Sequence, residues 1–221
     1  MIKADDERLN AVVYAELRKR LVTGKMAPGS ELSTRGLAHE MGVSQTPVRD
    51  ALSRLAAEGA VDIRSKRRVQ VPAMNQARFD DLLRCRLLLE PEAALLAMPH
   101  IDAARLQRLR EIDAALDQAI ADGDAEAYMN GNHAFHFTLY RAQGSRTLTQ
   151  LIETLWLQFG PFMRTVYGRL GTAPLVDQHR LAIEAIAKKD AAALKAAIAA
   201  DISDGMGLIS RSGLAAGGPA V

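Results

Sequence analysis

Cysteine and long uncharged stretches are scarce in this chain of 221 residues, and each scarcity excludes a class of protein. Cys85 is the only cysteine, which excludes an intramolecular disulfide and a metal site built from clustered cysteines. The longest stretch without a charged residue, 127–140, contains polar side chains and is too short for a transmembrane helix. The first residues are acidic and lack the apolar core of a signal peptide. We therefore expect a cytoplasmic protein with no membrane partner.

A large net charge is also missing, but the charges are unevenly distributed. The chain has a net charge of +2, with 48% hydrophobic and 24% charged residues, which is the composition of an ordinary globular protein. Residues 1–78 contain 14 Lys and Arg against 9 Asp and Glu, whereas residues 79–221 contain 14 against 17. A basic first third beside an acidic remainder indicates a polyanionic partner for the first third alone, although solvated surface charge gives the same imbalance.

Helical periodicity dominates the basic third. Apolar residues recur every four positions from Leu9 to Leu21, which predicts an amphipathic helix. Ser33 or Thr34 can cap the short helix that follows, and Ser44 has the residue type and position of an N-cap for the next one. The expected helices are 8–23, 35–41 and 44–58.

The second and third of these helices form a helix-turn-helix pattern, because a tight turn joins them and polar residues stand at the start of the third. Gln45, Thr46 and Arg49 share its outer face. Strand-like segments follow at 60–63 and 69–71, with four basic residues between them. Such a hairpin can lie against DNA phosphates as a wing. The alternative is a helical core with a solvated basic loop.

These segments resemble the winged helix-turn-helix of the GntR family. The resemblance rests on Leu32–Ala38 (LSTRGLA), Gly42–Leu52 (GVSQTPVRDAL) and Leu55–Gly59 (LAAEG). It implies that Arg35, Thr46 and Arg49 contact operator DNA. The family commonly has arginine where Gln45 stands and glycine where Arg68 stands, so we expect an atypical operator, since glutamine can read an adenine edge. The expected DNA-binding residues are Arg35, Ser44, Gln45, Thr46, Arg49, Lys66, Arg67 and Arg68.

The acidic remainder shows only helical periods beyond a linker at 72–76. The expected helices are 77–98, 102–121, 124–142, 146–169, 175–188 and 191–209. The Gly/Ala-rich tail, 213–221, is expected to be disordered. The predicted fold class is therefore mainly α, with an N-terminal winged helix-turn-helix domain, 1–74, followed by an all-α helical bundle effector domain, 75–221.

Polar residues interrupt the apolar stripes of several bundle helices and are expected to point inward. Asn132 and His136 are four residues apart and can reach one point. His179 and Asp201 lie on the inner stripes of the last two helices. Two imidazoles, an amide oxygen and a carboxylate suit a first-row divalent metal. The alternative is that each histidine is a hydrogen-bonded core residue.

Arg86 and Glu90 face the interior of the first bundle helix, four residues apart. They either form a buried ion pair or leave Arg86 to bind an anion, because a buried guanidinium without a partner is costly. We expect Arg86 to bind a small carboxylate effector, since its planar fork matches a carboxylate. Apart from Asp201, no inward carboxylate other than Glu90 is expected.

Four segments of the bundle resemble the effector domain of the FadR-like branch of GntR regulators, the FCD-type domain. They are Arg86–Glu90, Asn132–His136, Gln178-His179 and Ala185–Asp190. The family's metal set is one Asp and three His; here Asn132 stands at the Asp position and Asp201 replaces the last His. The resemblance implies a divalent metal ion of the Zn, Ni or Mn class, held by Asn132, His136, His179 and Asp201. Binding is expected to be weaker, because a neutral amide is a poorer ligand.

Together these observations predict a homodimeric transcriptional regulator, not an enzyme, that binds double-stranded operator DNA and senses a small carboxylate. A dimer is expected because a pseudo-palindromic operator needs two recognition helices and one chain supplies one. The main alternative is a metal-dependent all-α enzyme, which would need a general base and an open metal position. A structural DNA binder without an effector is a third hypothesis, and it leaves the inward polar cluster unexplained.

Overall fold

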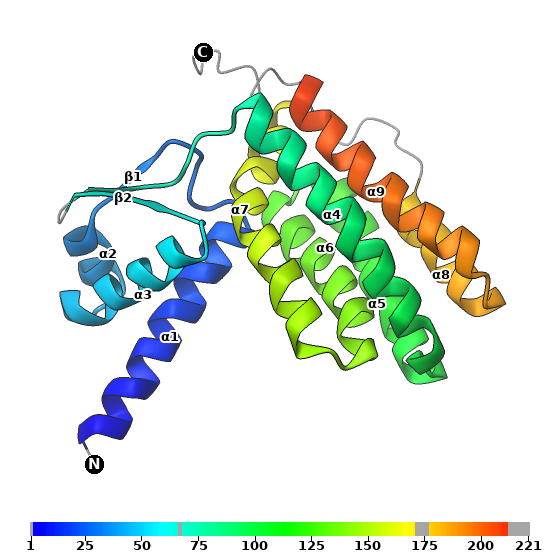
Figure 1. Ribbon diagram of the computed structural model, residues 1–221, viewed down its shortest axis with the longest axis horizontal. Coiled ribbons are helices and arrows are strands. Elements are labelled where there is room, and N and C mark those ends of the chain that lie inside the picture. Colours follow the sequence, from blue (N-terminus) through cyan, green and yellow to red (C-terminus); the bar gives the residue numbers. More distant parts are fainter. Residues whose placement is uncertain (1, 66–67, 171–176, 212–221) are drawn as a thin grey trace.

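The computed structural model describes residues 2–65, 68–170 and 177–211, and its elements fall into two groups (Figure 1). A small group of helices with a three-stranded sheet occupies one end of the molecule, and a bundle of longer helices occupies the other. The linker between them ends at Asn75, the N-cap of the first bundle helix. Most described residues are helical, which confirms a mainly α fold made of a winged helix-turn-helix and a helical bundle.

The first group is organised around helix α1. Its helices are α1 (Ile2–Val22), α2 (Thr34–Glu40) and α3 (Gln45–Ala57). Val13, Leu17 and Leu21 are almost fully buried at the predicted four-residue spacing. The prediction that Leu9 continues this stripe is wrong, because its side chain is 37% exposed. Helix α1 begins earlier than expected, and its first turns project beyond α2 and α3 in Figure 1.

A tight turn at Gly42 joins α2 to α3. Gly42 adopts a φ of +65°, a left-handed conformation that glycine reaches without strain. Ser33 caps α2, since its hydroxyl accepts a hydrogen bond from the backbone N–H of Gly36 at 3.1 Å. Ser44 occupies the N-cap position of α3, but its side chain makes no capping hydrogen bond. The Ser44 hydroxyl therefore stays available on the outer surface.

Three short strands form the wing. They are β1 (Glu31–Leu32), β2 (Asp62–Ser65) and β3 (Arg68–Gln70), paired antiparallel in the order β1-β3-β2. The sequence pattern does not predict β1, because two residues are too few to show alternation. Strand β2 begins at Asp62, two residues later than expected, since Ala60 and Val61 are buried before pairing starts. Lys66 and Arg67 lie outside the described residues.

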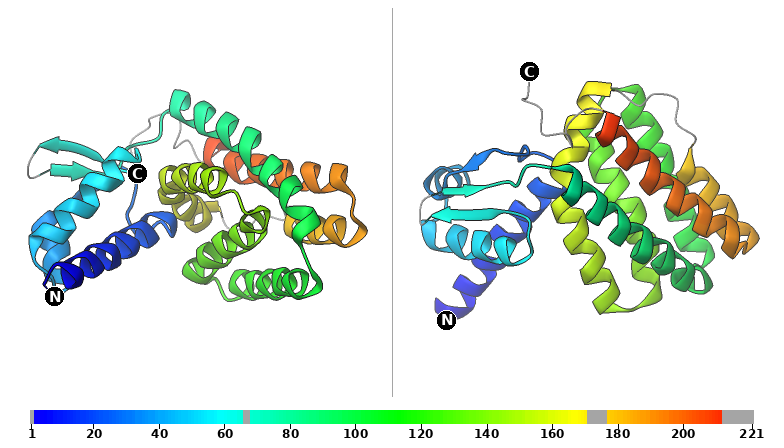
Figure 2. Two further views of the ribbon diagram at one scale, coloured as in Figure 1. Left: turned by 60° about the horizontal axis from the view of Figure 1, so that its bottom comes forward. Right: turned by 45° about the horizontal axis from the view of Figure 1, so that its top comes forward.

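Within the described residues the bundle has six long helices. They are α4 (Gln76–Ala97), α5 (Ala103–Ala121), α6 (Ala125–Tyr140), α7 (Arg146–Leu170), α8 (Gln178–Lys188) and α9 (Ala191–Arg211), with short 3-10 turns η1 (Met98–His100) and η2 (Arg141–Gln143). All six were predicted to within three residues at each end. Helices α4 and α9 lie side by side, as Figures 1 and 2 show. The predicted tail, 213–221, lies outside the described residues. No helix in the described part of the chain is long and apolar enough to cross a membrane.

Helix α7 also packs against the C-terminal end of α1, and this contact joins the two groups (Figure 2). A Cβ atom at Gly160 would lie 2.6 Å from the Cα of Val22 and 2.7 Å from the carbonyl oxygen of Leu21. The two helix backbones therefore meet directly at Gly160, where only glycine leaves enough space. We call this the α1–α7 contact.

Polar interactions flank the α1–α7 contact. Arg18 of α1 pairs with Glu153 of α7 at 2.9 Å. The side-chain amide of Gln158 donates a hydrogen bond to the carbonyl oxygen of Glu58, just after α3, at 3.1 Å. Arg78 donates both to the side-chain oxygen of Gln158 and to a backbone carbonyl of the first group, at 3.0 Å each. The first group is therefore held by the bundle along α7, not only by the linker.

Candidate functional site

Three of the predicted metal ligands converge inside the bundle. His136, His179 and Asp201 each offer one ligand atom, and these atoms lie within 4.8 Å of one another. Nε2 of His136 lies 3.1 Å from Oδ2 of Asp201 and 3.3 Å from Nε2 of His179. Nε2 of His179 lies 3.6 Å from Oδ1 of Asp201. We call these residues the metal cluster, because nitrogen and carboxylate donors facing one point are what a divalent metal requires.

Each member of the metal cluster comes from a different helix. His136 lies on α6, His179 in the first turn of α8, and Asp201 on α9. The N-cap of α8, Asp177, accepts a hydrogen bond from the backbone N–H of Arg180 at 2.9 Å, which fixes the turn that carries His179. His136 is fully buried, whereas the Asp201 side chain is 25% exposed. Solvent therefore approaches the cluster from the side of Asp201.

A chain of buried hydrogen bonds connects His136 to Arg86. Nδ1 of His136 lies 3.0 Å from the hydroxyl of Tyr140, and that hydroxyl donates to Glu90 at 3.0 Å. Glu90 also accepts from the indole N–H of Trp156 at 3.1 Å. Nε and Nη2 of Arg86 complete its set of donors. Glu90 is thus the centre of a polar network that spans α4, α6 and α7.

This network places the hydroxyl of Tyr140 between Glu90 and His136. Burial, followed by the charge of Glu90, raises the pKa of Tyr140 well above its usual value, so the hydroxyl keeps its proton and donates it to Glu90. The Tyr140 oxygen can then accept a hydrogen bond from Nδ1–H of His136. Nε2 of His136, on the other side of the ring, faces Asp201 and His179.

The surroundings of His179 and Asp201 favour the protonation states that a metal needs. Burial lowers the pKa of His179 to about 4, so its ring is neutral at pH 7. Burial opposes ionisation of Asp201, but the neighbouring His179 and His136 outweigh it and hold the pKa of Asp201 below its usual range. Metal binding requires deprotonated ligands, and His179 and Asp201 meet this requirement at neutral pH.

The remaining predicted residues of the site lie next to the cluster. Asn132 is buried on α6, one turn before His136, so the two share a face. Arg86 is 3% exposed, which confirms its inward placement. Burial acts against its charge, but Glu90 raises the pKa of Arg86, and Asp201 adds to this effect. The pKa of Arg86 therefore depends in part on the charge of Asp201 in the metal cluster.

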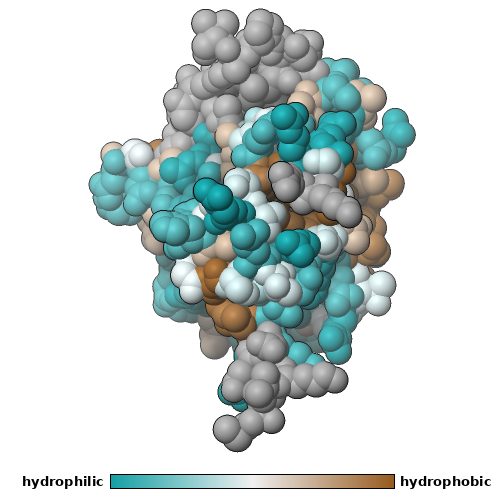
Figure 3. Space-filling model, turned by 90° about the vertical axis from the view of Figure 1, so that its left-hand side faces the viewer, coloured by the Kyte–Doolittle hydropathy of each residue, from teal (hydrophilic) through white to brown (hydrophobic). Residues whose placement is uncertain are grey.

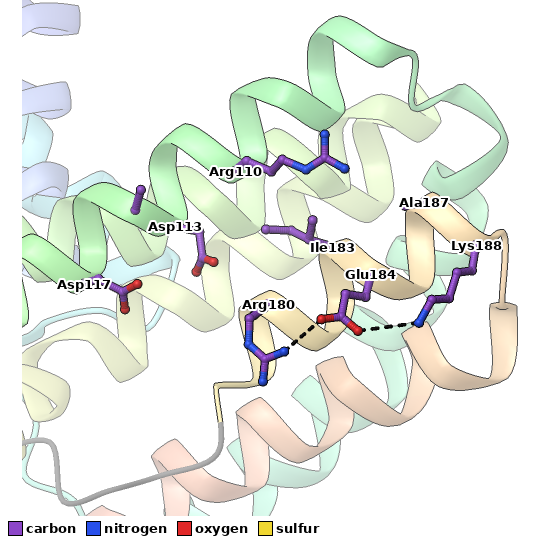
Figure 4. Close-up of a pocket in the computed structure, with 9 residues that line it drawn as sticks. Arg110, Asp113, Asp117, Arg180, Ile183, Glu184, Ala187 and Lys188 are labelled. Carbon is purple, nitrogen blue, oxygen red and sulfur yellow. Dashed lines mark hydrogen bonds and ion pairs between the residues drawn. The ribbon is translucent and has the colours of Figure 1, made fainter.

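The sequence pattern missed a further inward carboxylate, Asp113 on α5, so the expectation of none beyond Glu90 and Asp201 is wrong. Oδ1 of Asp113 lies 3.7 Å from Nδ1 of His179, the nitrogen that does not face the cluster. Asp113 also lines a cavity of about 340 Å³ between α5 and α8, together with Asp117 and Arg180 (Figure 4). Burial, with the charges of nearby aspartates, raises the pKa of Asp113 to about 6.

The predicted DNA-binding residues lie on the surface of the first group. The exposed or outward residues are Arg35, Gln45, Thr46, Arg49, Ser44 and Arg68. The opposite face of α3 is buried through Val48, Leu52 and Leu55, which holds the helix in place while its polar face stays outside. Figure 3 looks onto this end of the molecule, where hydrophilic side chains cover most of the visible surface. The structure therefore leaves this face open to a polar partner.

Two family models match the chain, and together they cover most of it. The model described as "Bacterial regulatory proteins, gntR family" matches residues 9–71. The model described as "FCD domain" matches residues 81–204, which is more than half of the chain. The boundary between the two matches falls where the linker leads into α4.

Curated relatives and solved structures agree with these matches. The HTH-type transcriptional regulator McbR of Escherichia coli is 32% identical over 82% of this chain and 84% of its own length. The gluconate operon transcriptional repressor of Bacillus subtilis is 29% identical over 81% and 76%. The solved structure titled E. coli McbR/YncC has a TM-score of 0.87 at 29% identity, covering 92% of this chain and 98% of that one. These named relatives are transcriptional regulators, and the hypothesis of a metal-dependent enzyme gains no support.

Proposed function

Because the chain belongs to the GntR family of bacterial regulatory proteins and contains an FCD domain, it is a DNA-binding transcriptional regulator, and we propose that its bundle senses a small carboxylate through a divalent metal. Residues 1–74 form the DNA-binding domain in this proposal, and residues 75–221 form the sensing domain. Effector binding in the sensing domain then changes the affinity of the first domain for operator DNA through the α1–α7 contact.

The convergence of donor atoms in the metal cluster is the observation that supports a metal. Nε2 of His136 lies 3.1 Å from Oδ2 of Asp201 and 3.3 Å from Nε2 of His179, and Nε2 of His179 lies 3.6 Å from Oδ1 of Asp201. A divalent cation among these atoms would bind ring nitrogens and a carboxylate oxygen from three different helices. Two imidazoles and a carboxylate fit the Zn, Ni or Mn class, with Asn132 as a further oxygen ligand.

Arg86 supports a carboxylate as the effector. A bound divalent metal supplies an electrophilic position for one carboxylate oxygen. Glu90 uses Nε and Nη2 of Arg86, so Nη1 is left for a second anion. The guanidinium also lies 4.4 Å from the ring centroid of Phe159, in surroundings that strengthen a charge-assisted hydrogen bond. One relative represses a gluconate operon, and gluconate is a carboxylate.

A thermal-shift screen of small carboxylates, with and without a chelator, tests this proposal. A ligand that binds the folded state stabilises it by about 2.7 kcal/mol at one hundred times its dissociation constant. We expect an effective carboxylate to raise the melting temperature of metal-loaded protein and to lose most of that effect after chelation. Metal titration that detects no binding would remove the metal from the proposal.

A homodimer is part of the same proposal. A palindromic operator needs two recognition helices about one DNA turn apart, and one chain supplies a single α3. Helix α4 offers an apolar surface for pairing, since Leu88 is 67% exposed and Leu96, two turns along, is 48% exposed. Light scattering should show a dimer, and Leu88→Asp should shift it toward monomer. A monomeric wild type that also binds the operator as one chain would rule the dimer out.

Asp113 gives a prediction about metal affinity. Carboxylates that contact the outer nitrogen of a ligating histidine orient its ring, and losing one typically costs 10–100-fold in metal affinity. We expect Asp113→Asn to weaken metal binding by about tenfold or more, measured by competition with a coloured chelator. Asp117→Asn is the matched control, because Asp117 lines the same cavity without contacting His179. Equal losses in both variants would mean that the general charge of the cavity matters, not the contact with His179.

The exposed arginines of the first domain give a prediction about DNA. Arg49→Ala should cost about 1–3 kcal/mol of specific binding, whereas Arg68→Ala should mainly lower the salt dependence, by about one unit of the log–log slope. Arg54 of the same helix is the control, because it already pairs with Glu58 and covers the ring of Tyr14. Fluorescence anisotropy at several salt concentrations measures both effects. Operator affinity equal to wild type in Arg49→Ala would contradict the assignment of this face of α3 to the DNA interface.

A further inference from the structure

A hollow between α5 and α6 has the features of an anion-binding site. Its volume is about 400 Å³, and it is lined by Arg105, His133, Ala134, Phe137, Thr138 and Arg141. This volume lies within the roughly 300–1,000 Å³ range of small-molecule pockets. None of the three metal-cluster residues lines it. We call it the α5–α6 hollow.

The lining of the α5–α6 hollow is positively charged, whereas its domain is acidic. Its lining contains two guanidinium groups and no carboxylate, whereas residues 79–221 contain more acidic than basic residues. His133 adds no third charge at pH 7, because burial and then Arg141 lower its pKa to about 4. The neutral ring and the Thr138 hydroxyl can each form a hydrogen bond to an anion held between Arg105 and Arg141.

An aromatic stack accompanies these charges, and its partly exposed member is His133, since Phe137 is 1% exposed. The rings of His133 and Phe137 are stacked with centroids 4.3 Å apart, and the Arg141 guanidinium lies 5.2 Å from the centroid of Phe137. Ala134 adds a small apolar side chain to the same lining. Guanidinium groups beside stacked rings match a ligand with a carboxylate at one end and a flat body at the other. We propose that the α5–α6 hollow is a second ligand site, which binds a small aromatic carboxylate through Arg105 and Arg141.

Arg141 also connects the hollow to the DNA-binding domain. Its Nη2 contacts Oε1 of Glu153 on α7 at 2.7 Å, and the other oxygen of Glu153 contacts Nη2 of Arg18 on α1 at 2.9 Å. A carboxylate in the hollow competes with Glu153 for Arg141 and leaves Glu153 to Arg18. Occupancy of the hollow therefore alters the polar flank of the α1–α7 contact, and with it the affinity for the operator.

Titration of benzoate into full-length protein treated with a chelator tests the site without a contribution from bound metal. Benzamide, a neutral molecule of the same shape, is the comparison ligand. We expect benzoate to bind at least about tenfold more tightly than benzamide. The neutral amide cannot form the charge-assisted hydrogen bonds that the carboxylate makes with two guanidinium groups. Arg105→Ala should weaken benzoate binding by about tenfold. Arg108→Ala, on the same helix, should leave it unchanged, since Arg108 pairs with Glu111 and does not line the hollow.

The possible outcomes separate cleanly. Failure of benzoate to bind, or equal binding of benzoate and benzamide, overturns the site. Benzoate affinity that is the same in Arg105→Ala and wild type overturns it as well, because the anion is then bound elsewhere. Operator affinity, measured by anisotropy with and without saturating benzoate, should change about fivefold or more. No change while benzoate is bound overturns the link through Glu153. A protein that binds no metal still tests the hollow, so this inference and the metal proposal fail separately.

Discussion

Replacing His136 and His179 by alanine together should abolish metal binding and remove the stabilisation that metal gives. At a metal concentration one hundred times its dissociation constant, the wild-type protein gains about 2.7 kcal/mol. For a chain of this size that corresponds to a rise of about 5–10 °C in the melting temperature. The double variant keeps at most Asp201 and Asn132 as ligands, and we expect no rise. Differential scanning calorimetry with added metal, together with metal analysis of purified protein, measures both.

Because His136 is buried, the double variant is accompanied by a milder one and a control. Asp201→Asn removes one negative charge while keeping the shape of the side chain, and its side chain is partly exposed. We expect it to weaken metal binding strongly with little change in the stability of the metal-free protein. His100→Ala, at an exposed histidine far along the chain from the cluster, should behave as wild type. Unchanged metal content in both the double variant and Asp201→Asn would place the metal elsewhere.

Arg86 separates metal binding from effector binding. Arg86→Ala would leave Glu90 buried without its charge partner, at a cost of about 3–5 kcal/mol, so a lysine is the better substitution. Arg86→Lys keeps the positive charge but loses the planar fork. We expect it to retain metal and to lose about tenfold in carboxylate affinity. An effector response equal to wild type in this variant would show that Arg86 pairs with Glu90 alone.

The second large effect concerns the α1–α7 contact. Gly160→Ala should undock α1 from α7, because the added Cβ would lie 2.6–2.7 Å from backbone atoms of Leu21 and Val22. Backbone cannot move aside as the end of a side chain can, so we expect a loss of about 1–3 kcal/mol or more. Limited proteolysis in the linker and the melting temperature report the undocking. Operator affinity should change while the metal affinity of the bundle stays within about twofold, since Gly160 does not contact the metal cluster.

Gly205 provides the matched control for this experiment. It also lies within a bundle helix, α9, but a Cβ atom there would meet only the methyl end of Met163 at 3.8 Å. Alanine favours a helix over glycine by about 0.5–1 kcal/mol, so Gly205→Ala should raise the stability slightly. The same gain in Gly160→Ala would show that the two helix backbones do not press against each other in solution.

The sequence predicted what depends on periodicity and missed what depends on the packing of separate helices. Arg86, His136 and Asp201 were placed inward because each falls on the apolar stripe of its own helix. The sequence around Asp113 does not predict its contact with His179, because that contact depends on how α5 and α8 pack. The same holds for Tyr140, whose hydroxyl lies between His136 and Glu90 but whose residue type is that of an ordinary core aromatic.

Contacts between the two domains were invisible for the same reason. Gly160, next to a proline within a helical pattern, predicts a local bend as readily as a close contact. Its role appears only when Val22, more than a hundred residues earlier, is placed against it. Leu9 shows the opposite error, a contact that was predicted and is not present. The four-residue apolar repeat of α1 includes Leu9, but only Val13, Leu17 and Leu21 are buried.

The hydrogen-bond network around Glu90 has a consequence for the valence of the effector. The charged side chains Arg86, Glu90 and Asp201 together give the site a formal charge of −1. A divalent ion inverts this to +1, and a monoanion then brings the chamber to electrical neutrality, which a low-dielectric interior favours. A dianion of equal size would leave it negative again. Affinities for mono-, di- and tricarboxylates of similar length, measured on metal-loaded protein, should therefore decrease in that order.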